Sequence, residues 1–126
     1  MITKHINIIK GIDNSIFEGK NVDPTVSPSK LNVKSIVISN NSSIESTVSV
    51  YIKTFNSITK TFFSFFIIKN VKIPSGVSLS VIDEEFNTTD EFSLVVKSSE
   101  SCSCRLYYNT LGDEEFIRSY KSNTTY

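Results

Sequence analysis

The chain has 126 residues, and its 13 basic and 13 acidic side chains leave no net charge. This length suits one cored domain rather than two. Neutrality, with Arg105 and Arg118 as the only arginines, argues against nucleic acid, whose binders concentrate basic side chains on one face. The longest nearly apolar run, residues 62–68, is far below the roughly 20 residues that cross a bilayer, so no membrane is expected as a partner. The first residues lack the apolar segment and cleavage site of a signal peptide, so secretion is not expected either.

The composition favours β-structure. Of the 126 residues, 38 are Ile, Val or Thr, and alanine, the best helix former, is absent. Short segments of alternating apolar and polar residues recur about every ten residues from position 30 onward, separated by turn formers. We therefore predict an all-β fold: an antiparallel β-sandwich, jelly-roll-like, with extended N- and C-terminal arms.

Five alternating segments define the predicted core. Their apolar faces assign inward positions in residues 31–38, 46–53, 77–81, 92–97 and 102–108. In the first segment the alternation places Leu31, Val33 and Val37 on one face, and in the second it places Val48, Val50 and Ile52 inward. A tight turn is expected at residues 73–76, where Pro74 fixes its own φ and Gly76 can adopt a positive φ. The predicted organisation is an N-terminal arm (residues 1–29), a β-sandwich core (30–108) and a C-terminal arm (109–126).

One segment, residues 61–68, does not alternate because both of its faces are apolar. If it is a regular strand, Phe63, Phe65 and Ile67 occupy one face and Phe62, Phe66 and Ile68 the other. One explanation is a central strand, with the N-terminal segment forming a second covering layer. The other is that one face contacts a neighbouring subunit, because an uncovered strand of this kind promotes aggregation. The candidate interface residues are Phe62, Phe63, Phe65, Phe66, Ile67 and Ile68.

The residues that usually carry chemistry do not assemble into a recognisable catalytic or metal site. The only histidine, His5, lies near the N-terminus, away from any partner expected for a triad or a metal. Cys102 and Cys104 share one face of a predicted strand without the further ligands of a zinc site, so we expect two reduced, buried thiols. The acidic residues around 83–85 and 90–91 lack the spacing of a calcium-binding loop, so a solvated loop is expected. The sequence therefore predicts no enzyme, no cofactor and no metal.

The order of features along the chain is more specific than its composition. Pro28 precedes the first core strand, which closes on an asparagine-rich turn at residues 39–42. An alternating strand and an aromatic strand follow, and then residues 73–79 have the pattern Ile-Pro-x-Gly-x-x-Leu. This order resembles a family of small virion structural proteins of tailed, T4-like phages, common in marine phages. The chain departs from that family at Thr89, where a glycine is typical, and in the 18 residues that follow Tyr108.

The resemblance implies a non-enzymatic structural component of a bacteriophage virion: a capsid decoration, neck or tail accessory protein. Its expected partners are other virion proteins and further copies of itself in a homo-oligomer, and its expected location is the virion, assembled in the host cytoplasm. The alternative is a receptor- or glycan-binding β-sandwich module of a phage fibre, because exposed aromatic rings commonly bind sugars. The aromatic residues available for that role are Tyr51, Tyr107, Tyr120 and Tyr126.

Overall fold

A computed structural model describes residues 1–19, 30–56, 58–82, 84–89 and 91–110 of the chain. The described residues form strands and turns, with no helix among them, which confirms the predicted all-β fold. No helix long and apolar enough to cross a bilayer occurs in this part of the chain. The strands are β1 (Ile2–Ile8), β2 (Asp13–Glu18), β3 (Leu31–Ser39), β4 (Ser46–Asn56), β5 (Thr61–Ile73), β6 (Ser78–Ser80), β7 (Phe86–Asn87), β8 (Phe92–Ser98) and β9 (Cys102–Thr110).

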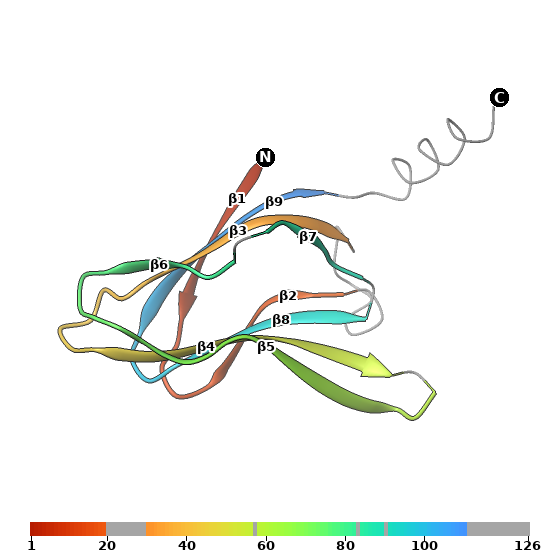
Figure 1. Cartoon of the computed structure of the whole chain (residues 1–126), viewed down its shortest axis with the longest axis horizontal. Helices are drawn as coiled ribbons and strands as arrows, with labels where there is room; N and C mark the ends of the chain where they lie inside the picture. The colour runs from red at the N-terminus through yellow and green to blue at the C-terminus, as the bar shows by residue number, and fades with distance from the viewer. Residues whose placement is uncertain (20–29, 57, 83, 90, 111–126) are drawn as a thin grey trace.

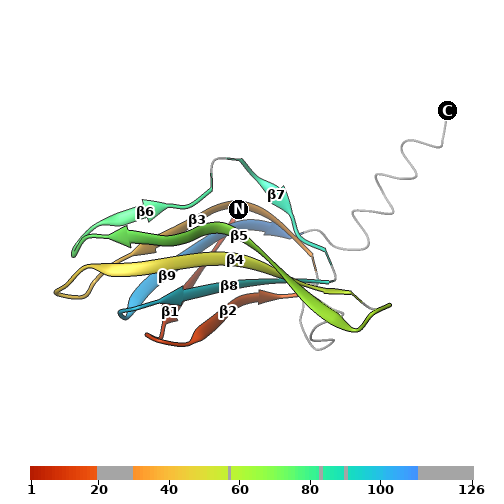
Figure 2. The same ribbon diagram turned by 60° about the horizontal axis from the view of Figure 1, so that its bottom comes forward.

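The strands form two antiparallel sheets that pack face to face (Figures 1 and 2). One sheet has the order β1-β9-β3-β6, with β7 also pairing with β3, and the other has the order β2-β8-β4-β5. The pairs are nested along the chain: β1 with β9, β2 with β8, β3 with β6 and β7, and β4 with β5. The chain thus behaves as one long antiparallel ribbon, doubled back at the β4–β5 turn and wrapped into two layers. This nesting, with β6 and β7 counted as one interrupted strand, is the jelly-roll arrangement.

The core lies between the two sheets and is built from β-branched and leucine side chains. Residues that alternate toward the interior on β3, β4, β8 and β9 are buried, as the sequence pattern predicts for strands with one core-facing side. Val48 and Val50 are fully buried, and Ile52 packs against the core from a partly exposed position. The largest fully buried apolar side chains are Ile8, Ile16, Ile36, Ile38, Ile73, Leu94, Leu106, Val33, Val48, Val50 and Val96.

The N-terminal segment is part of both sheets, which differs from the predicted arm over residues 1–29. β1 pairs with β9 from Ile2 to Ile8, and β2 pairs with β8 from Asp13 to Glu18. The side chains of Ile8, Ile16 and Phe17 are buried in the core. The remainder of the predicted N-terminal arm, residues 20–29, lies outside the described residues. The predicted C-terminal arm begins inside β9, which extends to Thr110, and residues 111–126 lie outside the described residues as well.

A bulge in β3 reverses the facing of the side chains that follow it, so they differ from the predicted facing. The register against β9 shifts between Val33 and Ser35, so one extra residue enters the strand at that point. After the shift, Ile36 and Ile38 face the core and are fully buried, whereas Val37 pairs with Arg105 on the outer face. Simple alternation put Val37 inward, and that assignment was wrong because a one-residue insertion reverses the facing of every later residue.

Candidate functional site

The β4–β5 hairpin carries the most exposed cluster of aromatic side chains described in the structure. Four phenylalanines of β5, Phe62, Phe63, Phe65 and Phe66, are 52%, 50%, 61% and 47% exposed. We call the part of the β4–β5 hairpin that carries them the aromatic hairpin. Figures 1 and 2 show that the hairpin extends past the rest of its sheet. β4 pairs with β8 only as far as Thr54, so the tip of the hairpin has no sheet neighbour beyond its own two strands among the described residues.

β5 is the last strand of its sheet, so the expectation of a central strand was wrong. The N-terminal strands do not cover it either, because β1 and β2 lie at the other edges of the two sheets. Ile67 and Ile68 pack against the core in partly buried positions. Of the six candidate interface residues, the structure therefore leaves the four phenylalanines exposed and places the two isoleucines beside the core.

The pairing with β4 assigns the phenylalanines to two faces. Directly paired residues project to the same side of a sheet. Phe65 pairs with Ile52 and Phe63 with Thr54, on the face that continues the core. Phe66 pairs with Tyr51 on the outer face, and Phe62 shares that face because it lies an even number of residues away along a regular stretch of the strand.

A bulge next to the aromatic hairpin changes the facing of the two isoleucines. The β4–β5 register steps from Ile68 opposite Val50 to Phe66 opposite Tyr51, which leaves Ile67 as an extra residue. Ile68 therefore shares the core-facing side with Phe63 and Phe65, although strict alternation assigned it to the side of Phe62 and Phe66. The predicted division of the four phenylalanines between the faces agrees with the register.

The outer face of the aromatic hairpin is held by ring and lysine contacts. The rings of Tyr51 and Phe66 lie 5.3 Å apart between centroids and are tilted by 47°. The ammonium group of Lys53 lies 4.8 Å from the ring centroid of Phe62, and that of Lys69 lies 4.9 Å from the ring centroid of Phe66. Contacts of this kind contribute about 0.5–1 kcal/mol each at exposed positions. They hold the rings in place and give this apolar surface a positive border.

Tyr51 anchors the outer face to the opposite edge of its sheet. Desolvation by burial raises the pKa of its phenol to about 12, and a hydrogen bond to the carboxylate of Asp13, together with the charge of that carboxylate, adds to the shift. Asp13 belongs to β2, so the phenol of β4 reaches across β8. The outer face near the aromatic hairpin is therefore ordered by a chain of contacts from Asp13 through Tyr51 to Phe66.

The tyrosines proposed for sugar binding do not share one surface. Tyr51 lies on the outer face of the β2-β8-β4-β5 sheet, where it contacts Phe66. Tyr107 alternates with the buried Leu106 on β9 and projects from the outer face of the other sheet, with the Arg105 guanidinium 5.9 Å from its ring centroid. Tyr120 and Tyr126 lie outside the described residues. The structure therefore brings no two of these four rings together within the part that it describes.

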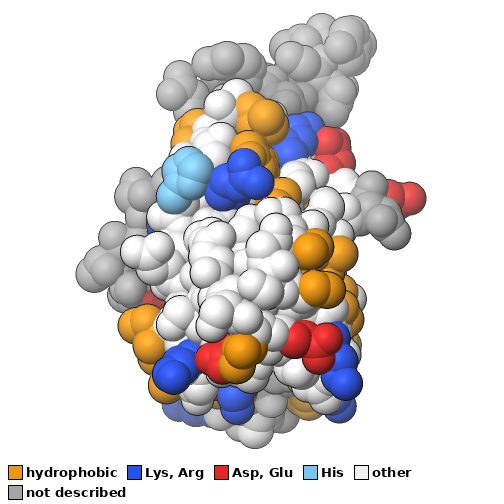
Figure 3. All heavy atoms as spheres, turned by 90° about the vertical axis from the view of Figure 1, so that its left-hand side faces the viewer, with side chains coloured by type: hydrophobic (Ala, Val, Ile, Leu, Met, Phe, Trp, Pro, Cys, Tyr) orange, Lys and Arg blue, Asp and Glu red, His pale blue; other side chains and the backbone are white. Residues whose placement is uncertain are grey.

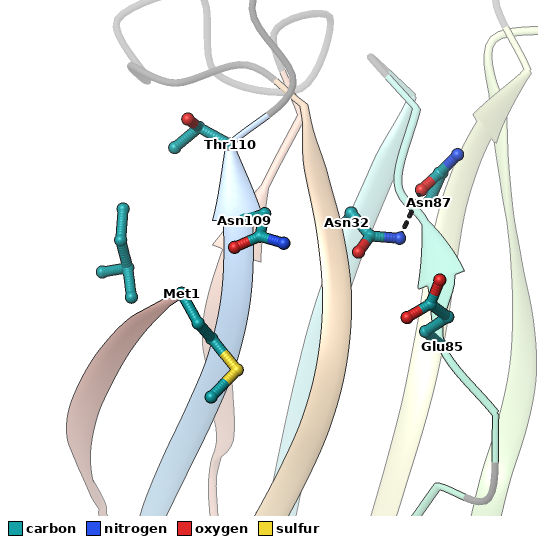
Figure 4. A pocket seen from close by; sticks show the side chains of 7 residues that line it. Met1, Asn32, Glu85, Asn87, Asn109 and Thr110 are labelled. Atoms are coloured by element: carbon teal, nitrogen blue, oxygen red, sulfur yellow. Dashed lines mark hydrogen bonds between the residues drawn. The ribbon is translucent and has the colours of Figure 1, made fainter.

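An open polar depression lies at the start of β1 and the end of β9, with a volume of about 640 Å³. Figure 4 shows the amides of Asn32, Asn87 and Asn109 and the carboxylate of Glu85 around it, with Asn32 donating a hydrogen bond of 2.8 Å to Asn87. The carboxylate of Glu85 also forms an ion pair with the ammonium group of Lys34. No sequence pattern marks these four residues as a group, because they come from three strands and a loop that only the folded topology brings together. The described residues that line it are Met1, Ile2, Asn32, Glu85, Asn87, Asn109 and Thr110.

The end of the sandwich opposite the hairpin tip is largely uncharged and polar. Figure 3 shows this end, where white side chains and backbone fill the centre and hydrophobic and charged groups lie around the rim. A second depression, of about 400 Å³, is lined by Asn7, Ile8, Ile9, Asn41, Ser42, Ser101, Cys102 and Ser103. Its polar atoms are serine hydroxyls and asparagine amides, so it carries no formal charge.

The fold places the two cysteines and the histidine, the residues considered for catalysis or metal binding, on opposite faces of one sheet. Cys102 and Cys104 are unpaired thiols that face the core, as predicted. His5 is exposed on β1 and pairs with Arg105, which alternates with those cysteines and projects from the opposite face of the sheet. No group of three histidine, cysteine or carboxylate side chains gathers anywhere in the described ranges. His5 therefore has no geometric relation to either thiol that would support nucleophilic chemistry.

Comparison with protein-family models, with curated protein sequences and with solved structures gave no match for this chain. The jelly-roll arrangement is shared by capsid and lectin domains. A fold common to both classes does not by itself separate a structural protein from a sugar-binding one.

Proposed function

We propose that this chain is a non-enzymatic structural protein of a tailed-phage virion, a capsid decoration, neck or tail accessory protein, and that it associates with itself and its neighbours through the aromatic hairpin. The observation that carries the proposal is the exposure of Phe62, Phe63, Phe65 and Phe66 on an edge strand. An exposed, hydrophobic edge strand is an aggregation hazard for a free monomer. In an assembly the same strand is covered, and its exposure becomes a source of binding energy.

The free energy available at this surface is consistent with association. A phenylalanine presents roughly 200 Å² of surface, so a half-exposed ring still has about 100 Å² to bury. At about 25 cal/mol per Å², each ring contributes about 2 kcal/mol when covered. Lost translational and rotational freedom opposes that gain. Four rings within five consecutive residues of β5 form the dense aromatic centre that is typical of energetically important interface residues.

The virion assignment is supported by the sequence resemblance. The features that carry it run from about Ser27 to Tyr108, and one of them, the turn of residues 73–79, shapes the end of β5. Gly76 has a φ of +76° in that turn, and its N–H donates a 2.8 Å hydrogen bond to the carbonyl of Asn40. The motif therefore has a structural role in joining β5 to β6, and no residue in it implies catalysis.

Purified phage particles test the proposal directly. Mass spectrometry of particles from the source phage should detect the chain in many copies per particle. A phage lacking the gene should be complemented by the wild-type chain but not by Phe65→Glu, because the charge prevents burial of the hairpin. The matched control is Ile44→Glu, since Ile44 is 57% exposed in a turn at the other end of the sandwich. Detection in lysate alone, never in particles, would overturn the virion assignment.

A second candidate, a sugar-binding module of a fibre, is favoured by one observation, the asparagine-lined depression in Figure 4. Amide and carboxylate groups can pair with sugar hydroxyls. Among the residues that the structure describes, however, no aromatic ring lines that depression to supply the stacking surface that sugar sites commonly use. A glycan array probed with the isolated protein separates the two candidates: binding that is lost in Asn109→Ala would favour the fibre module.

A further inference from the structure

We propose that the partner of the aromatic hairpin is a second copy of this chain, joined edge to edge by antiparallel pairing of β5 about a twofold axis at Ser64. This inference rests on the proposed function and names its first partner. The two four-stranded sheets would then form one continuous eight-stranded sheet, with β5 next to β5 at its centre. Because such an interface is isologous, the strand must be complementary to itself when it is reversed.

The sequence of β5 meets that requirement. Residues 62–66 read Phe-Phe-Ser-Phe-Phe and are identical in both directions about Ser64. In an antiparallel pair centred on Ser64, Phe63 of one copy lies opposite Phe65 of the other, and Phe62 lies opposite Phe66. Each of these four phenylalanines therefore lies opposite a phenylalanine of the other copy, which is a favourable type of cross-strand pair.

The two faces of the strand are consistent with this register. Phe62 and Phe66 share the outer face, and Phe63 and Phe65 share the core-facing side. Each predicted pair therefore unites residues that already project from the same side of the sheet, as opposite residues must. A register shift by one residue would bring residues from different faces opposite each other, so the facing excludes it. An axis at Phe63 or Phe65 keeps the facing but places Ser64 opposite a phenylalanine, so the palindrome selects the axis at Ser64.

The palindrome lies in the longest stretch of β5 that pairs with β4 without a register shift. Register irregularities against β4 fall at Ile67 and again between Ile68 and Val71, where Asn70 has a φ of +52°. Bulges and lysines are devices that protect a sheet edge from pairing, and Lys69 and Lys72 accompany these bulges. Residues 61–66 contain no register shift. One half of the edge is thus protected against pairing, and the half that is left regular is self-complementary.

The charges near the axis do not oppose the pairing. Lys60 and Lys69 lie four and five residues from Ser64 on opposite sides. In the twofold register Lys60 therefore faces residue 68 and Lys69 faces residue 59, so neither lysine is directly opposite another lysine. Like charges placed directly opposite destabilise a strand pair, and this arrangement avoids them.

The surface buried by the pairing predicts a reversible dimer. Eight half-exposed rings would bury about 800 Å² together, which is below the roughly 1,200 Å² at the lower limit of stable protein interfaces. The exposed residues that flank the strand, including the 92% exposed Ile58, add to this area. We therefore expect a dimer that forms in the micromolar range and becomes measurable by analytical ultracentrifugation as the protein concentration rises.

A cysteine at the axis tests the register. In Ser64→Cys the two new thiols lie directly opposite each other, and Cα atoms about 4.5–5.5 Å apart are within the span of a disulfide. Mild oxidation should convert Ser64→Cys into a covalent dimer. The matched control is Lys72→Cys on the same strand, whose two copies would be about 50 Å apart across the axis and should form no covalent dimer. The wild-type protein should also form no covalent dimer, because both of its own thiols are buried.

A pair of complementary charges tests the same register without oxidation. Phe63→Glu and Phe65→Lys should each weaken the homodimer by about tenfold or more, because each places two charges against aromatic rings. Mixed in equal amounts, they should form a heterodimer, in which one glutamate faces one lysine and the remaining Phe63–Phe65 pair is restored. Circular dichroism of each variant should match the wild type, since both rings are about half exposed in the monomer.

The outcomes distinguish this inference from the proposed function. Equal oxidation of Ser64→Cys and Lys72→Cys, or absence of heterodimer formation, would overturn the β5–β5 pairing. If the pairing fails in these assays while Phe65→Glu still cannot complement the phage, the hairpin serves a different virion protein and the proposed function stands. If Phe65→Glu complements fully, the proposed role of the aromatic hairpin in the virion fails, whatever the oligomeric state in solution.

Discussion

Asn40 closes the corner between β3 and β4 with a buried side chain that uses its full hydrogen-bonding capacity. Its amide nitrogen donates to the carbonyls of Ile44 and Ile73 at 2.8 and 2.9 Å. Its amide oxygen accepts from the backbone N–H and the hydroxyl of Ser42 at 3.0 and 2.6 Å. Buried carbonyls that lose their donors retain the desolvation cost without the compensating bond. We therefore regard Asn40 as the residue that fixes the β5–β6 turn against the β3–β4 turn.

Replacing Asn40 by alanine should lower the free energy of unfolding by about 1–3 kcal/mol, because it removes the amide donor to the carbonyl of Ile73 and leaves the Ser42 hydroxyl as the side-chain donor to the carbonyl of Ile44. The neighbouring Asn41 is exposed and makes a 2.9 Å hydrogen bond to the hydroxyl of Ser103. Asn41→Ala should therefore change stability by no more than about 0.5 kcal/mol. Urea denaturation of both variants measures the difference, and equal effects would contradict the role assigned to Asn40.

The two cysteines occupy different environments and should respond differently to replacement by serine. Cys104 is fully buried in the apolar core, so Cys104→Ser places a hydroxyl there at a cost of about 1–3 kcal/mol. The Sγ of Cys102 already lies 3.3 Å from the hydroxyl of Ser98 and 3.4 Å from the carbonyl of Glu100. A serine hydroxyl at that position finds partners, so Cys102→Ser should cost clearly less. Thermal denaturation that ranks the two variants in the opposite order would contradict this assignment.

Burial also controls the ionisation of Cys104 and hence the alkaline stability of the protein. Desolvation raises the pKa of this thiol from 9.0 to about 12. Between these pH values the unfolded chain releases the proton while the folded chain keeps it, so the stability contributed here is present below pH 9 and decreases as the pH rises. The slope should approach about 1.4 kcal/mol per pH unit in that window. Urea denaturation from pH 8 to 11 should show a smaller decrease for Cys104→Val than for the wild type.

At the level of the strands, alternation predicted where strands occur but not where they are interrupted. It located β3, β4, β6, β8 and β9 and correctly placed the core-facing residues of β4. It failed at Val37 and at Ile67 and Ile68, because a bulge adds one residue whose presence depends on the partner strand. The same limit applies to β5: its two apolar faces were evident in the sequence, but its edge position follows from sheet topology. The aromatic residues of the candidate site were therefore predictable, and their exposure was not.

Asn70 is the residue on which the bulged half of β5 depends. Its φ of +52° is disfavoured for most side chains, and its N–H donates a 2.9 Å hydrogen bond to the hydroxyl of Ser49. Asn70→Val should lower stability by about 1–3 kcal/mol, because a β-branched residue is strained at positive φ. Asn70→Gly keeps the N–H and relieves the strain, so its effect should be much smaller. Chemical denaturation compares them, and a valine variant as stable as the glycine variant would contradict the backbone argument.

At the level of the whole molecule, the nested pairing makes the two ends of the ribbon depend on each other. β1 completes one sheet next to β9, and β2 completes the other next to β8. A sequence reading that begins the core at residue 30 misses this, because the N-terminal segments are short and one of them, β2, contains a register shift between Ser15 and Phe17. Only the long-range pairing with the last two strands identifies them as parts of the sandwich.

Residues 8 and 9 provide a matched test of whether the N-terminal segment belongs to the core. Ile8 is 1% exposed on β1, and the adjacent Ile9 is 59% exposed. Ile8→Asp should cost about 3 kcal/mol or more, because it buries an unpaired charge, whereas Ile9→Asp should stay within about 0.5 kcal/mol. Deletion of residues 1–12 removes β1 and uncovers the edge of β9, so it should abolish cooperative unfolding measured by circular dichroism. A deletion variant that still unfolds cooperatively, with an Ile8→Asp variant as stable as the wild type, would show that the strands after residue 30 form an independent core.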